Sequence, residues 1–365
     1  MKSESFWLKI IEEKPSKLAQ LGLYLLSGIY ISAVKFRNWL YRVRILKSQK
    51  LSVPVISVGN ITVGGTGKTP VVHLLARYYQ NQGKKVVILS RGYKRNNCQP
   101  IVLVSNYEQV LVDWKIAGDE PYQLAQSLPG VAVVVGNQRR ITGNYAIREL
   151  SPDLIILDDG FSHQQVARTI NLVLIDATRP FGNNYYLPAG RLREPISSLK
   201  RADIVLLTKT KSDKNYTELI SQIQNLKPSI PIYTAKTVPV KITEISEQKE
   251  LPVSALNREP ILAFAGIANP GPFKDTLLEL NAEVKSFFPF PDHYVYSENE
   301  LQYLLEQAAQ TQCKFLITTK KDAAKLRNIL DKFPEQRHRF LALEIDYEIQ
   351  HAVEFLTILD SGLRT

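Results

Sequence analysis

Cysteine is scarce in this sequence, with two residues among 365, Cys98 and Cys313. They lie far apart and have no neighbours of the metal-binding kind, so we expect neither a disulfide framework nor a cysteine metal site. Zinc-finger spacing and an aromatic RNA-binding signature are also missing. The net charge of +11 favours an anionic partner, and a phosphorylated substrate or an acidic membrane surface ranks above nucleic acid. Charge that serves solubility alone is the alternative.

Internal repeats and low-complexity tracts are absent as well, which argues against a solenoid and against disorder. Hydrophobic residues make up 44% of the chain and charged residues 22%, the composition of an ordinary folded protein. A length of 365 residues leaves room for two domains.

One apolar segment stands near the N-terminus. Leu18–Val34 holds seventeen residues without a charge, slightly fewer than the roughly 20 that a membrane-spanning helix needs. Lysines flank this segment and aromatic residues follow it, among them Trp39, and both kinds favour the headgroup zone. We predict a helix on an anionic membrane surface. A buried core helix and a single span remain alternatives, whereas Glu4 and the acidic residues after it disfavour a cleaved signal peptide.

From about Leu51 onward, short β-branched runs alternate with helix-like stretches. Runs this apolar indicate strands covered on both faces, as in a parallel sheet. The pattern predicts an α/β fold. The strands predicted first are Val53–Val58, Val86–Leu89, Val131–Val135, Leu154–Leu157, Leu172–Ile175 and Ile204–Leu207.

A softer, proline-rich region spans Lys227–Pro252, and we interpret it as a linker or hinge. The alternation then resumes with strands at Ile261–Ala265 and Phe315–Thr319 and a helix at Glu298–Gln310. The predicted organisation is a membrane-associating helix in 1–45, a nucleotide-binding domain in 46–230 and a smaller α/β domain in 231–365.

The segment SVGNITVGGTGKTP joins a predicted strand to a glycine-rich loop and to a helix expected over Val71–Gln80. It matches the P-loop pattern G-x-x-x-x-G-K-[ST], except that Thr62 replaces the first glycine. Glycines let backbone amides turn towards phosphate oxygens, and the helix N-terminus adds positive charge. A glycine-rich turn without chemistry is disfavoured by the strand before it and the GKT ending. The predicted nucleotide-binding residues are Thr62, Val63, Gly64, Gly65, Thr66, Gly67, Lys68 and Thr69.

Lys68 is expected to reach the β- and γ-phosphates of the nucleotide, and the Thr69 hydroxyl to ligate Mg²⁺. A second predicted strand ends in Asp158 and Asp159, within LIILDDGFSHQ. An acidic residue at such a strand end holds Mg²⁺ in P-loop enzymes. Both aspartates are therefore candidate metal ligands, and the alternative is a capping turn before a helix.

Two further residues are candidates for proton transfer. Asp119, in AGDEP, either caps a helix from Pro121 to Leu128 or acts as a base on a hydroxyl nucleophile. His293 lies in the aromatic, proline-rich segment FFPFPDHYVY. A lone histidine is usually structural, but an imidazole paired with a carboxylate transfers protons well.

Basic side chains follow several predicted strand ends. Arginines at this edge of a parallel sheet point to the ligand crevice and bind phosphate through paired N–H groups. A solvated surface charge is the alternative for each. The candidate substrate-binding residues are Arg91, Tyr93, Arg139, Arg140, Arg193 and Glu194.

Together these segments resemble the tetraacyldisaccharide 4′-kinases of lipid A biosynthesis. The resemblance runs from residue 53 to about residue 326, with its motifs in the family's order. These motifs are VPVISVGNITVGGTGKTP, LSRGYKR, GDEP, VVVGNQRR, DDGFSHQ, LPAGRLREP, FPDHYVYS and TTKKDAAKL.

The resemblance implies transfer of the γ-phosphate of ATP, with Mg²⁺, to the 4′-hydroxyl of a tetraacylated disaccharide 1-phosphate, giving lipid IVA. It implies a place at the cytoplasmic face of the inner membrane of a Gram-negative bacterium. It also implies that Asp119 and His293 form the base pair acting on the sugar hydroxyl, and that Asp158 and Asp159 lie at the metal and phosphate site. Closure of two lobes would assemble such a site and exclude water.

Two positions depart from the family pattern. Ser162 replaces the glutamine of DDGFQH, and Lys320 stands where the family usually has glutamate. The alternative function is a membrane-associated P-loop switch or partitioning ATPase, which would not need Asp119 and His293 together.

Overall fold

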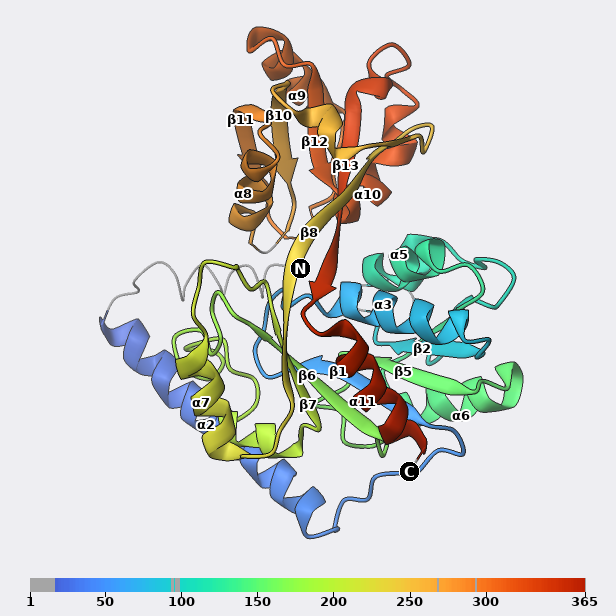
Figure 1. The fold of residues 1–365 in the computed structure, drawn as a ribbon, viewed down its shortest axis with the longest axis vertical. Helices are drawn as coiled ribbons and strands as arrows, with labels where there is room; N and C mark the ends of the chain where they lie inside the picture. Colours follow the sequence, from blue (N-terminus) through green and yellow to red (C-terminus); the bar gives the residue numbers. More distant parts are fainter. Residues whose placement is uncertain (1–16, 93–94, 96–98, 268, 293, 365) are drawn as a thin grey trace. The chain divides into compact units, whose positions relative to one another are not determined.

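The computed structural model describes residues 17–92, 95, 99–267, 269–292 and 294–364. The described chain forms two compact units. The larger unit comprises residues up to Lys236 together with those from Tyr347 onward, and the smaller unit comprises residues 237–346. Two strands, β8 (Ile232–Glu244) and β13 (Phe340–Ile349), run from one unit into the other (Figure 1).

The larger unit is built on a sheet in the order β3-β4-β2-β5-β1-β6-β7-β8. Every pairing in it is parallel except that of β3 with β4. The predicted parallel α/β sheet is therefore confirmed. Its strands are β1 (Val55–Asn60), β2 (Val86–Ser90), β3 (Val102–Ser105), β4 (Ala132–Val135), β5 (Leu154–Asp158), β6 (Ile170–Asp176) and β7 (Ile204–Thr208).

Helices cover both faces of this sheet, which explains why its strands are apolar throughout. Ile88 and Ile156 pack on one face with α3 (Lys68–Asn81), α5 (Asp119–Ser127) and α11 (Ala352–Arg364). Val87 and Ile155 pack on the other face with α6 (Arg139–Leu150). Further helices of this unit are α2 (Lys17–Arg42), α4 (Trp114–Ala117), the 3₁₀ helix Ile196–Arg201 and α7 (Thr217–Leu226).

The smaller unit has its own sheet, in the order β11-β10-β12-β13, with parallel pairings. The helix α9 begins with a capping box between Ser297 and Glu300, as the sequence pattern favours. The other elements are β9 (Glu250–Leu251), β10 (Pro260–Ala265), α8 (Gly271–Glu279), β11 (Glu283–Pro289), α9 (Glu298–Gln310), β12 (Phe315–Thr319), α10 (Lys320–Leu330) and 3₁₀ turns at Val253–Leu256 and Arg337–Arg339.

The end of the chain belongs to the larger unit. Phe355 and Leu359 of α11 are fully buried in its core, and Tyr78 of α3 donates a hydrogen bond of 2.7 Å to Asp360. These C-terminal residues were predicted in the smaller domain, 231–365. That prediction is wrong for them, because packing against distant residues leaves no local pattern in the sequence. The smaller unit is therefore an insertion in the larger one, and it begins within β8 and ends within β13 (Figure 1).

The predicted linker Lys227–Pro252 contains β8, a strand of 13 residues. The segment Ile232–Glu244 is therefore a regular strand, and the boundary between the two units lies within it. β-branched residues alternate along TAKTVPVKITE, and this alternation favours a strand despite the proline.

The N-terminal helix α2 spans Lys17–Arg42 and is long and apolar enough to cross a membrane, by length and composition alone. Its inward side is a narrow stripe that includes Leu23, Ser27 and Ile31. Its outward side carries large apolar residues, with Leu25 64% and Ile29 68% exposed. The alternative of a buried core helix is therefore wrong.

Candidate active site

The phosphate loop connects β1, which ends at Asn60, to α3, which begins at Lys68. Gly64 and Gly67 have φ angles of 108° and 82°, a backbone region that residues with a Cβ rarely adopt. Thr62 is not among the residues of positive φ and forms an antiparallel bridge with Leu192. A glycine is therefore unnecessary at the first position of this loop.

Polar contacts hold this loop in shape. The Thr66 hydroxyl accepts a hydrogen bond of 2.7 Å from the side-chain amide of Asn60, and its carbonyl accepts one of 2.9 Å from the Thr208 hydroxyl. Lys209 donates to the Gly65 carbonyl and, at 2.6 Å, to Asp176. The ends of β1, β6 and β7 are thus tied to the loop.

Asp158 is the last residue of β5 and is 3% exposed. Its carboxylate accepts a hydrogen bond of 2.8 Å from Ser90, at the end of β2. Burial, together with the neighbouring Glu120 and Asp159 carboxylates, raises the pKa of Asp158 to about 6. Negative charge at this strand end is therefore incompletely balanced by the protein.

Asp159 follows with a φ of 56°, and its carboxylate contacts two cationic side chains, Arg193 and Lys68. Arg193 donates to both of its carboxylate oxygens, and the Lys68 ammonium lies 3.7 Å away. Burial alone would raise the pKa of Asp159, but Arg193 and Lys68 outweigh burial and lower it. Arg193 also donates to the Asn60 side chain, so one arginine joins the acidic pair to the phosphate loop.

Two predicted substrate-binding residues are buried. Arg139 is 1% exposed and donates to the carbonyls of Gly136 and Asp158. Glu194 is 0% exposed, and both of its oxygens are occupied by side chains of the protein. Neither side chain is therefore exposed to a ligand in this structure, and sequence alone does not separate a buried charged side chain from an exposed one.

Arg91 and Arg140 are exposed beside the ends of β2 and β4, where a ligand can reach them. Tyr93 lies outside the described residues. Asp119 is the first residue of α5, and the N-cap is Gly118, with no side-chain cap. Asp119 therefore lies one residue after the N-cap position, and its side chain is partly buried.

His293 lies outside the described residues. The residues on either side of it are held in the smaller unit. Asp292 pairs with Lys321 at 3.0 Å, and the Lys325 ammonium donates to the Tyr294 carbonyl at 3.1 Å.

Sequence reasoning missed several residues of the larger unit's site, namely Asn60, Ser90, Asp176, Thr208 and Lys209. Each lies at, or directly after, the carboxyl end of a parallel strand, and the rule that ligands bind at that edge could have found them. His163, in the DDGFSH motif, was missed too. Burial, followed by the charge of Arg139, lowers its pKa to about 4, which keeps its imidazole neutral.

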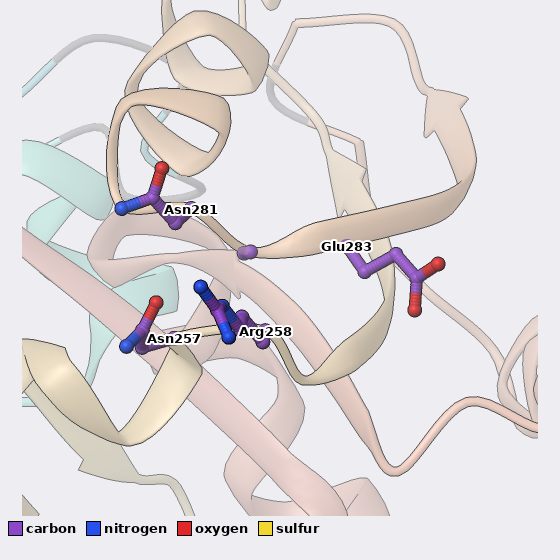
Figure 2. Close-up of a pocket in the computed structure, with 5 residues that line it drawn as sticks. Asn257, Arg258, Asn281 and Glu283 are labelled. Carbon is purple, nitrogen blue, oxygen red and sulfur yellow. The ribbon is translucent and has the colours of Figure 1, made fainter.

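A hollow in the smaller unit is lined by Asn257, Arg258, Asn281, Ala282 and Glu283 (Figure 2). It lies where β10 and β11 begin. The Arg258 amide donates to the Asn281 carbonyl at 2.8 Å across it. No predicted site residue lines this hollow, and it is at the amino end of the strands, away from the edge where ligands usually bind.

Comparisons with known proteins identify relatives over nearly the whole chain. A family model described as Tetraacyldisaccharide-1-P 4′-kinase matches residues 19–364. A tetraacyldisaccharide 4′-kinase of Syntrophus aciditrophicus is 37% identical over 346 residues, which is 93% of this chain and 92% of the relative. One of Aquifex aeolicus is 38% identical over 312 residues, 84% of this chain and 90% of the relative.

A crystal structure titled as the "apo" form of LpxK from Aquifex aeolicus in complex with ATP resembles this fold with a TM-score of 0.74. The two sequences are 33% identical, and the match covers 94% of this chain and 99% of that one.

Proposed function

The chain belongs to the tetraacyldisaccharide 4′-kinase family, and we propose that it transfers the γ-phosphate of ATP to the 4′-hydroxyl of a tetraacylated disaccharide 1-phosphate. One observation carries the proposal: Lys68, at the end of a glycine-rich loop, lies 3.7 Å from Asp159, which Arg193 also holds. The similar structure from Aquifex aeolicus, titled as a complex with ATP, supports ATP as the donor. The family favours a kinase over a switch or partitioning ATPase.

The phosphates of ATP would bind along residues 62–69. The amides of the loop and the N-terminus of α3 supply partial positive charge, and Lys68 supplies a full charge at the β- and γ-phosphates. Phosphoryl transfer depends on positioning and charge neutralisation more than on covalent help. Arg193 orients Asp159 towards Lys68 and so fixes the arrangement of charges at the transferred group.

The donor set fits Mg²⁺. Nucleotide-bound Mg²⁺ takes one or two carboxylates and a hydroxyl from the protein and its other ligands from phosphates and water. Such a site needs no cluster of acidic or histidine ligands, and the described residues contain no group of three or more. Asp158, whose charge is less balanced than that of Asp159, would hold the ion with Thr69, with Asp159 beside it. The bound ion would neutralise charge developing on the phosphates.

The acceptor hydroxyl must lose a proton. The proposal assigns this proton to Asp119 with His293, as the resemblance to the family implies. Asp119 is fixed as the first residue of α5. Among the arginines, Arg91 and Arg140 remain available for the phosphate of the lipid substrate, and Tyr93 stays a candidate beside them.

The lipid substrate calls for contact with a membrane. The outward side of α2 presents apolar residues without a protein partner in the described structure, and the chain carries a net charge of +11. An apolar helix face and a basic protein together favour an anionic bilayer. We place the enzyme at the cytoplasmic face of the inner membrane of a Gram-negative bacterium, with α2 in the membrane surface.

Radiolabelled ATP incubated with disaccharide 1-phosphate tests the proposal, with chromatography of the lipid product. We expect label on the lipid with wild-type protein, none with Lys68→Ala, and none with an acceptor that lacks the 4′-hydroxyl. Lys50→Ala, an exposed lysine, is the matched control and should retain activity. Release of inorganic phosphate at the same rate without acceptor would favour the ATPase instead.

A further inference from the structure

The helix α2 turns polar side chains, not only apolar ones, towards the protein. Ser27 donates a hydrogen bond of 2.9 Å to the Tyr186 carbonyl, and Tyr30 donates one of 3.0 Å to the Arg193 carbonyl. Arg37 and Asn38 both contact Glu194. All four contacts reach one segment, residues 186–194, which contains all of the GRLREP motif except its proline.

Glu194 is the centre of this contact. One carboxylate oxygen accepts from Arg37 at 2.6 Å, and the other accepts from Asn38 at 2.9 Å. Ser198 and Arg201 also donate to the second oxygen, each at 3.1 Å. A fully buried carboxylate is costly without such donors, and two of the four come from α2. The carboxylate is therefore fully satisfied only while α2 is docked.

The residue before Glu194 faces the opposite way. Arg193 holds Asp159 and Asn60, and the backbone around it pairs with the phosphate loop. The Val63 amide donates to the Arg191 carbonyl at 2.8 Å, and the Arg193 amide donates to the Ile61 carbonyl at 2.9 Å. The segment thus lies between α2 on one side and the phosphate loop on the other.

A second contact connects α2 to the acidic motif. The Asn38 side chain accepts a hydrogen bond of 2.6 Å from Gln164, which closes the DDGFSHQ segment. The same amide donates to Glu194. One asparagine on α2 therefore joins the segment that carries Arg193 to the segment that carries Asp158 and Asp159.

From these contacts we propose that α2 positions the phosphate site through Glu194 and Asn38, which are positioning residues for the transfer. Docking of α2 fixes residues 186–194, and this fixes the position of the Arg193 guanidinium on the Asp159 carboxylate. The helix that meets the bilayer is then also the helix that completes the site, so lipid contact and catalytic geometry depend on the same element. The kcat measurement rests on the proposed function, whereas the positioning role of α2 rests on its contacts with Glu194 and Gln164.

The test compares Arg37→Gln with Arg42→Gln. Both variants remove one positive charge from α2, and Arg42 is exposed at the end of the helix. Their attraction to an anionic bilayer therefore falls alike, whereas only Arg37→Gln loses the contact with Glu194. The measurements are kcat with disaccharide 1-phosphate in mixed micelles and the dissociation constant of a fluorescent ATP analogue.

We expect Arg37→Gln to have a kcat about tenfold lower than that of Arg42→Gln, because a small misplacement of catalytic groups lowers the rate strongly even when its cause lies far from the reacting atoms. Nucleotide affinity should weaken about threefold or more, while circular dichroism and partition onto phosphatidylethanolamine–phosphatidylglycerol vesicles stay equal in the two variants. Arg37→Lys should recover most of the lost rate, which a loss of stability alone would not predict. Asn38→Ala serves in place of Arg37→Gln if the latter does not fold.

Equal kcat and equal nucleotide affinity in Arg37→Gln and Arg42→Gln would overturn the inference. A wild-type protein that binds the ATP analogue but labels no lipid would overturn the proposed function instead. In that case the nucleotide affinities of the two variants still decide whether α2 positions the site.

Discussion

The hydroxyl of Tyr347 occupies the space that a Cβ atom on Gly67 would fill. Tyr347 lies on β13 where that strand enters the larger unit, and Gly67 is the last residue before α3. The phosphate loop is thus supported by a residue almost three hundred positions later in the chain. The glycine is required both by this contact and by its φ of 82°.

Gly67→Ala should weaken ATP binding about tenfold or more, because relief of the overlap moves the loop amides away from the phosphates. Gly83→Ala is the matched control. Gly83 has a similar φ of 80° and no atom within 4 Å of an added Cβ, so it should lose stability of about 1 kcal/mol and no affinity. Titration with a fluorescent ATP analogue measures the difference, and equal affinities in the two variants would contradict the expectation.

Asp119→Ala and His293→Ala should each lower kcat strongly, with little change in ATP affinity. Two residues that act as one base have non-additive effects. The double variant should therefore be about as slow as the slower single variant. Steady-state kinetics of all three variants provide the measurement, and a double variant that shows the product of the two single losses would mean independent roles.

Lys320, the departure from the family's glutamate, forms an ion pair of 2.6 Å with Glu344. Burial raises the pKa of Glu344, but Lys320 and the Thr243 hydroxyl lower it more, to below its ordinary 4.5. A lowered carboxyl pKa stabilises the fold above the unfolded-state value, and this stabilisation is lost as the pH falls through the folded-state value. The pair should therefore stabilise the fold at pH 7, and its contribution should shrink as the pH falls below 4.5.

Lys320→Gln should cost about 0.5 kcal/mol at pH 7, seen as roughly twofold faster hydrogen exchange in α10 and β13. The difference between the variant and the wild type should narrow as the pH is lowered below 4.5. Lys249→Gln, at an exposed position of the same unit, controls for the loss of charge. An equal gap at pH 7 and below pH 4.5 would show that Glu344 is not the partner that matters.

Leu25→Ser with Ile29→Ser should reduce partition onto anionic vesicles about tenfold or more, since two exposed apolar side chains of α2 would no longer enter the lipid. Val353→Ser, on α11 and 79% exposed, is the control at an outward position away from α2. Co-sedimentation with vesicles gives the partition coefficients. If the double variant partitions like the control, another surface meets the membrane.

The sequence was sufficient for features that local patterns determine. The strand before Asp158 and the glycine-rich loop before Lys68 follow from apolar periodicity and spacing, and both occur as predicted. Burial of charged residues does not follow from local patterns. Arg139 and Glu194 have the composition of ligand-binding residues, and they are buried because helices and loops far away in the chain supply their partners.

The placement of α11 is a second case of this kind. Its amphipathic pattern predicts a helix but contains nothing about which sheet it covers. Similarly, the prolines of Lys227–Pro252 suggested a linker, whereas pairing with β7 makes the beginning of β8 a strand of the sheet.

The insertion of the smaller unit also sets an order of events during synthesis. Tyr347, Ile349, Phe355 and Leu359 complete the apolar core around α3 and β6, and the ribosome makes them after the smaller unit. Domains usually fold in the order in which they emerge from the ribosome. Here the larger unit emerges first but cannot complete its core until the smaller unit has been made. The smaller unit can fold while the sheet of the larger one still lacks α11, so a chain that stops before residue 347 would leave a nucleotide-binding domain open on one face.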